Sequence, residues 1–167
     1  MSVNEVLKQA EKDFGLGGST FKFQEGVNKF RILSDFAALQ SEYKGNKSVK
    51  FLAHVLDRKD AKVKLAFFPY SIAKVVAEYE ASEDYGFKSF PMPYDITVKA
   101  EDAGKITVNY IPTPGKETAL TAEEQALVAD LEPIDDVRHR IHEEQTKKAV
   151  EAATSAGGDI TAEYLPE

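Results

Sequence analysis

The chain has 167 residues, 43% of them hydrophobic and 29% charged, with a formal net charge of −7 and no cysteine. One domain with short appendages is the usual organisation at this length. The lack of cysteine excludes disulfides, thiolate metal sites and thiol nucleophiles, and it is typical of a reducing compartment. No apolar run approaches the length of a membrane span, and the first residues mix charges rather than forming a signal peptide. We therefore expect a cytoplasmic protein with no membrane segment.

The charge is distributed unevenly along the chain. Residues 117–167 carry a formal charge of −9, whereas residues 19–74 carry +6. Exposed charges act over about 8 Å at physiological salt, so a partner responds to the local patch rather than to the total. A basic body with an acidic tail is compatible with a polyanionic ligand, although a solvated surface of mixed charge explains the same counts.

Apolar residues at helical spacing predict an amphipathic helix within residues 1–18. The glycines at Gly15, Gly17 and Gly18 end this helix. They do not predict a phosphate loop, because such a loop follows a strand and opens a helix.

Apolar and polar residues alternate over much of residues 20–110, which predicts strands. Ser71 is the predicted N-cap of a helix that runs to about residue 80. The aromatic loop over residues 83–93 is interpreted as a plug for the end of a barrel. The predicted strands and connections are, in order, a bent first strand through Phe21 and Phe30, a polar connection over 35–48, strands over 49–56 and 62–68 joined by a turn at 58–61, and strands over 94–99 and 106–110 closed by Pro112 and Pro114.

This order predicts a mainly β fold with appended helices. Strand, strand, strand, helix, strand, strand is the order of the five-stranded Greek-key barrel that binds oligonucleotides or oligosaccharides (the OB-fold), with a helix between strands three and four. The regular strand–helix alternation of a parallel sheet is absent. The predicted organisation is an N-terminal helix (1–18), the barrel (19–116), a C-terminal helical arm (117–156) and an acidic flexible tail (157–167).

The C-terminal arm begins with a capping box formed by Thr121 and Glu124. Pro133 then interrupts the helical pattern, and apolar residues at Ile134 and Val137 continue it in a narrower stripe.

Signals for an enzyme are weak, so we expect no catalytic residues, no metal and no cofactor. His139 and His142 lie three residues apart on a predicted helix, but the H-E-x-x-H spacing of zinc proteases is absent and arginines flank the pair. No nucleophile elbow or phosphate loop is present, and without cysteine there is no Cys–His pair.

The alternating strands instead predict a binding face. If Val63, Leu65 and Phe67 point into the core, the other side of that strand shows cations beside the exposed ring of Phe68. Cations neutralise phosphates and an aromatic ring stacks a base, as single-stranded nucleic acid requires. The candidate nucleic-acid-binding residues that this reasoning gives are Lys29, Arg31, Tyr43, Lys50, His54, Lys62, Lys64, Phe68 and Tyr70, and the resemblance below adds Lys74.

Five stretches resemble the framework of bacteriophage single-stranded DNA-binding proteins: residues 26–34 (GVNKFRILS), 67–74 (FFPYSIAK), 93–98 (PYDITV), 111–114 (IPTP) and 120–124 (LTAEE). The resemblance covers roughly residues 20–145. It implies an OB-fold barrel that coats DNA strands in phage replication and recombination, and an acidic tail that recruits partner proteins. It also implies phosphate contacts by Lys29, Arg31, Lys62, Lys64 and Lys74. The chain departs from the family in having no tryptophan, so stacking falls to Phe and Tyr.

We therefore predict a non-enzymatic protein that binds single-stranded DNA with little sequence preference, with replication or recombination proteins as further partners of its acidic C-terminal region. The alternative is a phage assembly or protein-interaction module built on the same barrel. The choice between RNA and DNA stays open, because it depends on contacts to the 2′-hydroxyl. We further hypothesise that the acidic C-terminal segment competes with DNA, so that deleting residues 154–167 raises the affinity.

Overall fold

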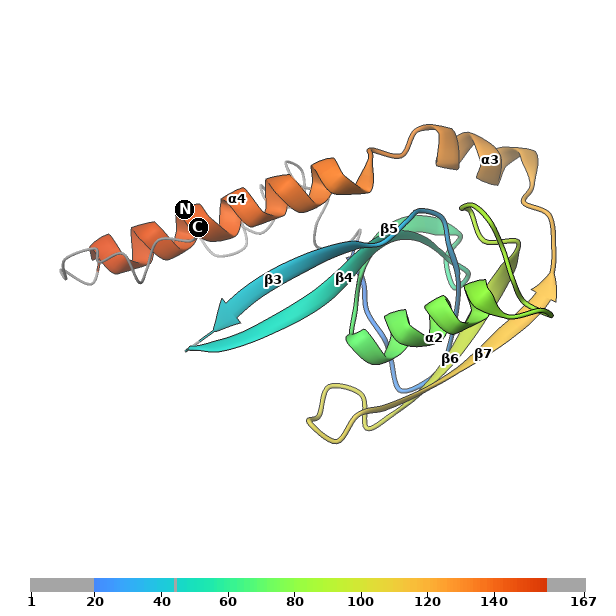
Figure 1. Ribbon diagram of the computed structural model, residues 1–167, viewed down its shortest axis with the longest axis horizontal. Helices are drawn as coiled ribbons and strands as arrows, with labels where there is room; N and C mark the ends of the chain where they lie inside the picture. The colour runs from blue at the N-terminus through green and yellow to red at the C-terminus, as the bar shows by residue number, and fades with distance from the viewer. Residues whose placement is uncertain (1–19, 44, 156–167) are drawn as a thin grey trace.

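The structure is a computed structural model that describes residues 20–43 and 45–155. Within these residues the chain is mainly β, with seven strands and three helices (Figure 1). The elements are β1 (Thr20–Phe21), β2 (Gly26–Ile32), β3 (Ala37–Tyr43), β4 (Asn46–Asp57), β5 (Lys62–Phe68), α2 (Tyr70–Ala81), β6 (Tyr94–Glu101), β7 (Asn109–Glu117), α3 (Ala122–Ala129) and α4 (Ile134–Ser155). The predicted N-terminal helix (1–18) and acidic tail (157–167) lie outside the described residues.

The strands form one mixed, open sheet in the order β1-β5-β4-β2-β6-β7, and β3 pairs with β4 outside this order. Paired strands are antiparallel except for β1 and β5, which run parallel with Thr20 opposite Leu65. A closed barrel would require β7 to pair with β5, but β1 occupies that edge of β5. The predicted five-stranded closed barrel is therefore not confirmed. The helix α2 does follow the third long strand of the predicted order, where the sequence pattern places it.

The segment 35–48, predicted as a polar connection, contains a strand and a tight turn instead. β3 pairs with the first half of β4, from Ala37 opposite Leu52 to Tyr43 opposite Asn46. Gly45 in the turn has φ 80°, a left-handed conformation that costs glycine little because it has no Cβ. Of the β3 side chains that the structure describes, Ala37 and Leu39 are buried. Two apolar residues are too short a pattern to predict a strand.

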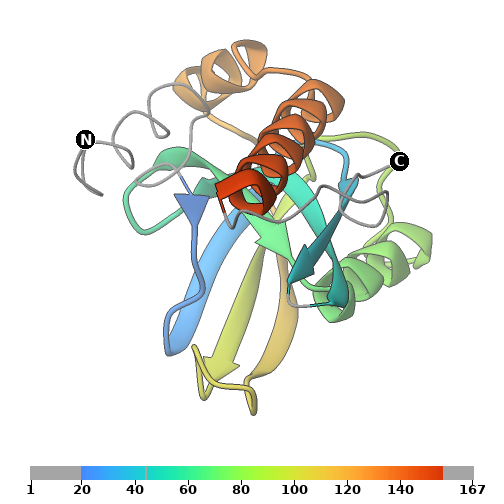
Figure 2. The ribbon, with the colours of Figure 1, turned by 90° about the vertical axis from the view of Figure 1, so that its left-hand side faces the viewer.

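Apolar side chains pack on both faces of the sheet. The inner core is rich in aromatic rings and comprises Phe21, Phe30, Ile32, Ala53, Val55, Ala66, Phe68, Ile72, Val76, Met92, Tyr94, Ile96 and Val98. The second cluster joins the opposite face of β3, β4 and β5 to α4 and comprises Ala37, Leu39, Leu52, Leu65, Ile134, Val137 and Ile141. Burial of each large aliphatic side chain contributes roughly 1.5–3 kcal/mol, so three such residues hold α4 on the sheet. Figure 2 shows α4 crossing this face.

The orientation of β5 is opposite to the prediction. Phe68 pairs with Phe51 and Ala66 with Ala53, so these residues share the inner face. Leu65 and Phe67 belong to the cluster under α4 instead. Because helices and loops cover both sides of β5, both of its faces are apolar, and the alternation alone does not indicate which face points inward.

The helix boundaries agree with the sequence in one case and differ in another. The capping box is confirmed, since the Thr121 side chain accepts from the Glu124 backbone N–H and the Glu124 side chain accepts from the Thr121 backbone N–H. The predicted Ser71 cap is wrong, because the N-cap of α2 is Pro69, two residues earlier, and it makes no side-chain cap hydrogen bond. None of the described helices is long and apolar enough to cross a membrane.

Pro112 and Pro114 lie inside β7 rather than closing the strand region. They pair opposite Val98 and Ile96 of β6. Proline donates no backbone hydrogen bond, so it is tolerated on an edge strand, and β7 is the edge of this sheet.

The aromatic loop between α2 and β6 packs against the inner core, but its interpretation as a barrel plug stays a prediction because the sheet is not closed. Phe87 and Phe90 are partly buried and pack against the inner core. Tyr85 is 42% exposed, and its carbonyl accepts a hydrogen bond of 2.7 Å from the Tyr94 hydroxyl.

Candidate functional site

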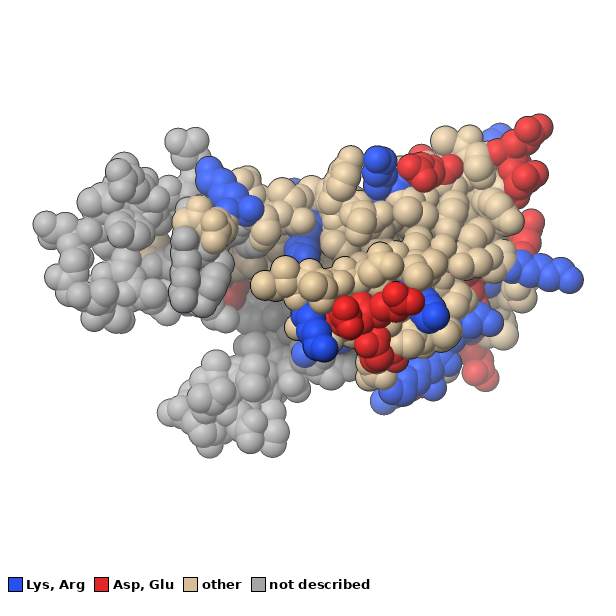
Figure 3. Space-filling model, turned by 90° about the horizontal axis from the view of Figure 1, so that it is seen from below, with Lys and Arg blue, Asp and Glu red and all other residues tan. Residues whose placement is uncertain are grey.

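The structure distributes the ten predicted binding residues over several surfaces instead of one face. Arg31, Lys64 and Phe68 are buried or held by other residues, and His54 is half-buried. The Tyr43 side chain lies outside the part of the chain whose side chains are described. The exposed members are Lys29, Lys50, Lys62, Tyr70 and Lys74. Figure 3 shows one face of the molecule, on which Lys and Arg lie in separate groups interrupted by Asp and Glu.

Phe68 is fully buried, which corrects the prediction that its ring is available to a base. Its ring stacks on Phe30 with centroids 5.5 Å apart and also lies 5.8 Å from Phe36. It is a central residue of the inner core, so the predicted site cannot be built around it.

Arg31 is the second correction. Its position in β2 points away from the inner core, as predicted, but the side chain is 1% exposed. Nε donates to Asp95 Oδ1 at 2.8 Å and Nη1 donates to the Thr118 carbonyl at 2.6 Å. The chain that follows β7 covers this position, so Arg31 is not a surface phosphate contact.

Lys64 is also engaged, because β5 has the opposite orientation. Its Nζ lies 2.8 Å from both Asp57 Oδ2 and Asp60 Oδ2. Burial lowers the pKa of Lys64, but the hydrogen bonds to the two carboxylates outweigh it and raise the pKa overall. The hydrogen bond that Lys64 donates to Asp60 lowers the pKa of Asp60. A lysine neutralised by two carboxylates is a poor phosphate contact.

The outer face of β4 and β5, which is part of the predicted binding face, is covered together with β3 by α4. His54 lies on this face and its Nε2 is 2.8 Å from the Glu132 carbonyl, just before α4 begins. Since a carbonyl oxygen only accepts hydrogen bonds, Nε2 is the nitrogen of the His54 ring that carries a hydrogen here, and it donates to the Glu132 carbonyl. Lys50 lies on the same face nearer the end of the hairpin and remains exposed.

The structure brings two predicted residues together at the start of α2. Pro69 ends β5 and makes Tyr70 the first helical residue, with 64% of it exposed. Lys74 follows one helical turn later on the same side and is exposed. The Tyr70 ring lies against the half-buried Phe51 of β4, with centroids 6.3 Å apart and an angle of 47°.

The adjoining face of the β3–β4 hairpin extends this surface. Lys47 and Val49 share the face of Phe51, because side chains alternate along a strand, and Val49 is 45% exposed. In Figure 1 the hairpin extends beyond the body of the sheet, with α2 beside it. We name this surface the hairpin–helix corner; it comprises Lys47, Val49, Phe51, Tyr70 and Lys74.

Sequence reasoning missed three of these five residues. The sequence assigns Phe51 to the core because it alternates with Lys50. Phe51 does lie on the core side of β4, but its side chain is only half-buried. Lys47 was placed in a connection rather than a strand. A recognisable signal was the Lys44–Gly45 pair, which suits a two-residue hairpin turn and would have extended β4 toward it.

The remaining predicted cations lie elsewhere. Lys29 is on the outer face of β2, opposite Thr97 of β6. Lys62 is at the start of β5, opposite Asp57. His139 forms an exposed pair of 3.0 Å with Glu143, and the described residues contain no group of three side chains able to hold a metal ion.

No protein-family model, curated protein or solved structure matches this chain. What the corner can do therefore follows from its chemistry. It offers one exposed phenol ring, a second ring behind it, and ammonium groups on both the helix and the hairpin. A flat ligand with negative charges on either side satisfies all three features.

Proposed function

We propose that the chain binds single-stranded DNA at the hairpin–helix corner, with little sequence preference, and coats strands during phage DNA replication and recombination. The observation that carries the proposal is the exposed Tyr70 ring, backed by Phe51 and followed one turn later by Lys74. A base stacks on Tyr70, and the ammonium groups of Lys74 and Lys47 neutralise the flanking phosphates. Every base has a π face, so stacking gives affinity without selecting a sequence.

The arrangement of the strands supports the same proposal. When β2 and β3 are taken as one long strand interrupted at residues 33–36, the strands and α2 follow the order of the OB-fold. That fold is often partly open, and the loop between its first two strands contacts oligonucleotides. Here that loop is the turn between β3 and β4, at the end of the hairpin that carries Lys47 and Val49.

The same comparison explains why we place the strand at the corner. The outer face of the second and third strands is the other common contact surface of this fold. In this protein α4 occupies it through Ile134, Val137 and Ile141. The hairpin–helix corner lies outside the area that α4 covers, so Tyr70, Lys74 and Lys47 remain exposed.

The test is a pair of substitutions at one position. Tyr70→Leu removes the ring but keeps an apolar side chain, and Tyr70→Phe keeps the ring. Binding of a fluorescent oligo-dT of about 15 nucleotides, followed by anisotropy, should weaken by about 1–3 kcal/mol in Tyr70→Leu and stay near wild type in Tyr70→Phe. An unlabelled duplex should compete poorly, and an RNA strand of equal length measures the choice between DNA and RNA.

Two outcomes contradict the proposal. Equal affinity of Tyr70→Leu and Tyr70→Phe would show that no base stacks at this ring. An affinity that does not fall as salt rises would show that phosphates are not neutralised.

The second candidate is a protein-interaction or phage assembly module. The observation in its favour is that the corner exposes Val49 and Tyr70 next to a half-buried Phe51, an apolar surface that also suits a protein partner. This candidate predicts no measurable oligo-dT binding, with Tyr70→Leu instead weakening self-association or partner capture.

A further inference from the structure

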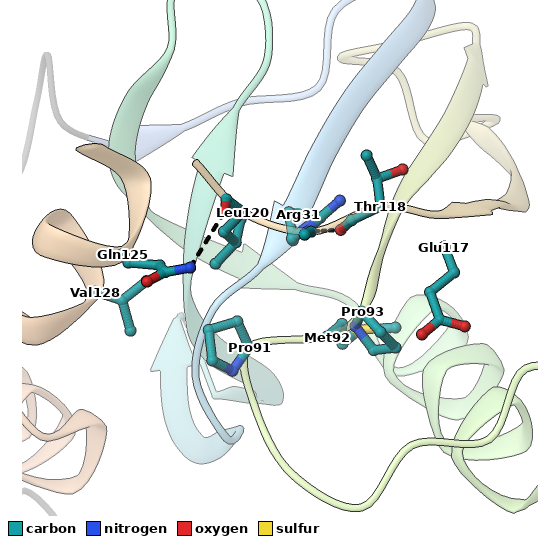
Figure 4. A pocket seen from close by; sticks show the side chains of 10 residues that line it. Arg31, Pro91, Met92, Pro93, Glu117, Thr118, Leu120, Gln125 and Val128 are labelled. Atoms are coloured by element: carbon teal, nitrogen blue, oxygen red, sulfur yellow. Dashed lines mark hydrogen bonds between the residues drawn. The ribbon is translucent and has the colours of Figure 1, made fainter. Parts of the chain in front are cut away.

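A pocket of about 400 Å³ opens between the segment before β6, the end of β7 with the chain that follows it, and α3 (Figure 4). In Figure 1 the end of β7 and α3 lie at the opposite end of the molecule from the tip of the β3–β4 hairpin. The walls of the pocket are mostly apolar, with Pro91, Met92 and Pro93 on one side and Leu120 and Val128 on another. Pockets of this size with a few fixed polar groups are typical of ligand sites.

One of those polar groups is a buried donor without a partner. Arg31 lines the pocket and is 1% exposed. Asp95 and the Thr118 carbonyl hold Nε and Nη1, but Nη2 is buried and has no hydrogen-bond partner among the described residues. Buried donors are almost always satisfied, and those of a charged group most of all. The exception points to an acceptor that a ligand supplies.

A network of ion pairs fixes this guanidinium in place. Asp95 also accepts from Arg58, and Arg58 in turn pairs with Glu124 at the start of α3. Burial lowers the pKa of Arg58, but hydrogen bonds to the two carboxylates outweigh it. The network therefore joins β2, β6, the turn before β5 and α3 around one arginine. A group already oriented loses little freedom on binding.

The charge around the pocket argues against an anionic ligand. Residues 117–132 contain five acidic residues and no lysine or arginine. Asp95 and Glu124 are already paired with arginines, whereas Glu117 lines the pocket and is exposed. Phosphates are repelled here, and a cation is attracted.

We propose that this pocket binds a short segment of a partner protein in which an apolar residue stands next to a lysine or arginine. A backbone carbonyl of the segment accepts from Arg31 Nη2 once the part of the pocket wall that covers this atom has shifted aside. The apolar side chain packs between Pro91, Leu120 and Val128, and the basic side chain pairs with Glu117. The carbonyl, the apolar group and the cation each match a feature that the pocket presents, and a nucleic-acid strand matches only the first two. The proposal is independent of DNA binding at the corner.

The test uses the full chain, labelled with ¹⁵N, and two small probes that differ in one charge. Acetyl-Leu-Lys-amide and acetyl-Leu-Glu-amide are titrated separately, and the amide signals of Leu120 and Val128 are followed. We expect saturable shifts with the lysine probe, at concentrations about fivefold lower than with the glutamate probe. The Arg31 Nη2 protons should shift with them, and this readout needs no substitution of Arg31, which the fold depends on.

A matched pair of variants separates the pocket from the general acidity of α3. Glu117→Gln should remove most of the preference for the lysine probe, whereas Glu123→Gln, exposed on α3 and outside the pocket, should preserve it. Equal binding of the two probes, or shifts that Glu117→Gln leaves unchanged, would overturn the proposal. So would a titration in which the dinucleotide d(TT) shifts these signals and the peptides do not.

Discussion

The two ends of the molecule use cationic side chains in opposite ways. At the hairpin–helix corner, Lys47 and Lys74 are exposed, and no ion pair among the described residues involves them. At the pocket end, Arg31 and Arg58 are held by carboxylates and orient the surrounding segments. The difference teaches that a basic residue near a predicted face is available to a ligand only where the fold leaves its charge unneutralised.

The largest expected effect comes from substituting, one at a time, the two aromatic residues on either side of Pro69. Phe68→Ala should cost about 3–5 kcal/mol of unfolding free energy, because it opens a cavity in the inner core. Tyr70→Leu should leave the unfolding free energy nearly unchanged, since that ring is largely exposed. Urea unfolding measures both. A stable Phe68→Ala variant would mean that the ring is not a core residue.

The pocket end should depend strongly on Arg58. Replacing it by glutamine removes the link between Asp95 and Glu124, and we expect a loss of about 1–2 kcal/mol in unfolding free energy. The neighbouring Lys59→Gln is the matched control, because Lys59 is exposed and its Nζ donates to the Gln24 side chain rather than to a carboxylate of the network. Urea unfolding of the two variants gives the difference. Equal stability of both would show that the network does not hold α3 on the sheet.

A smaller effect distinguishes two lysines that sequence reasoning treated alike. Lys74→Gln should weaken oligo-dT binding several-fold and reduce the slope of log affinity against log salt by about 0.7, the value for one phosphate of a single strand. Lys64→Gln should leave that slope unchanged, because two carboxylates already neutralise Lys64. Anisotropy titrations over a series of salt concentrations measure both slopes. A reduced slope in Lys64→Gln alone would reverse the assignment.

The smallest expected effect is a dependence of α3 on pH. The pKa of Glu124 is lowered most by the hydrogen bond from the Thr121 backbone N–H. The side-chain hydrogen bond from Arg58 lowers it further. A carboxylate with a lowered pKa stabilises the folded state above its unfolded pKa of about 4.3, and this contribution is lost as the pH falls through the lower folded value. The protection factors of the α3 amides, which correct for the intrinsic slowing of exchange in acid, should therefore fall at acidic pH. In Glu124→Gln the protection factors should already be lower at neutral pH and change less with acid.

Much of the fold follows from patterns that depend on neighbours in the chain. The alternation around Phe30 and Tyr94 predicts strands that the structure contains, and the Thr121 capping box predicts the start of α3. The strand β3 was not predictable in this way. Its burial comes from α4, whose stripe of apolar residues begins 97 residues after Ala37 at Ile134.

The candidate site was predictable only in part for the same reason. Tyr70 was predicted from its place next to the expected helix start, which is a local signal, and Lys74 was predicted from the family resemblance. The environment of Arg31 was misjudged because strand pairing brings Asp95 to it from a distant part of the chain. The environment of Lys64 was misjudged because the turn before β5 brings Asp57 and Asp60 to it.

The sequence by itself determined the kind of most elements, the approximate positions of β2, β4, β5, α2 and β6, and the capping box of α3. Only the tertiary structure decided which face of β5 is inside, that α4 covers the outer face of the sheet, and that β1 occupies the edge needed for closure. Periodicity records that a residue alternates with its neighbours, but burial depends on what packs against each face, and that is set by segments distant in the chain.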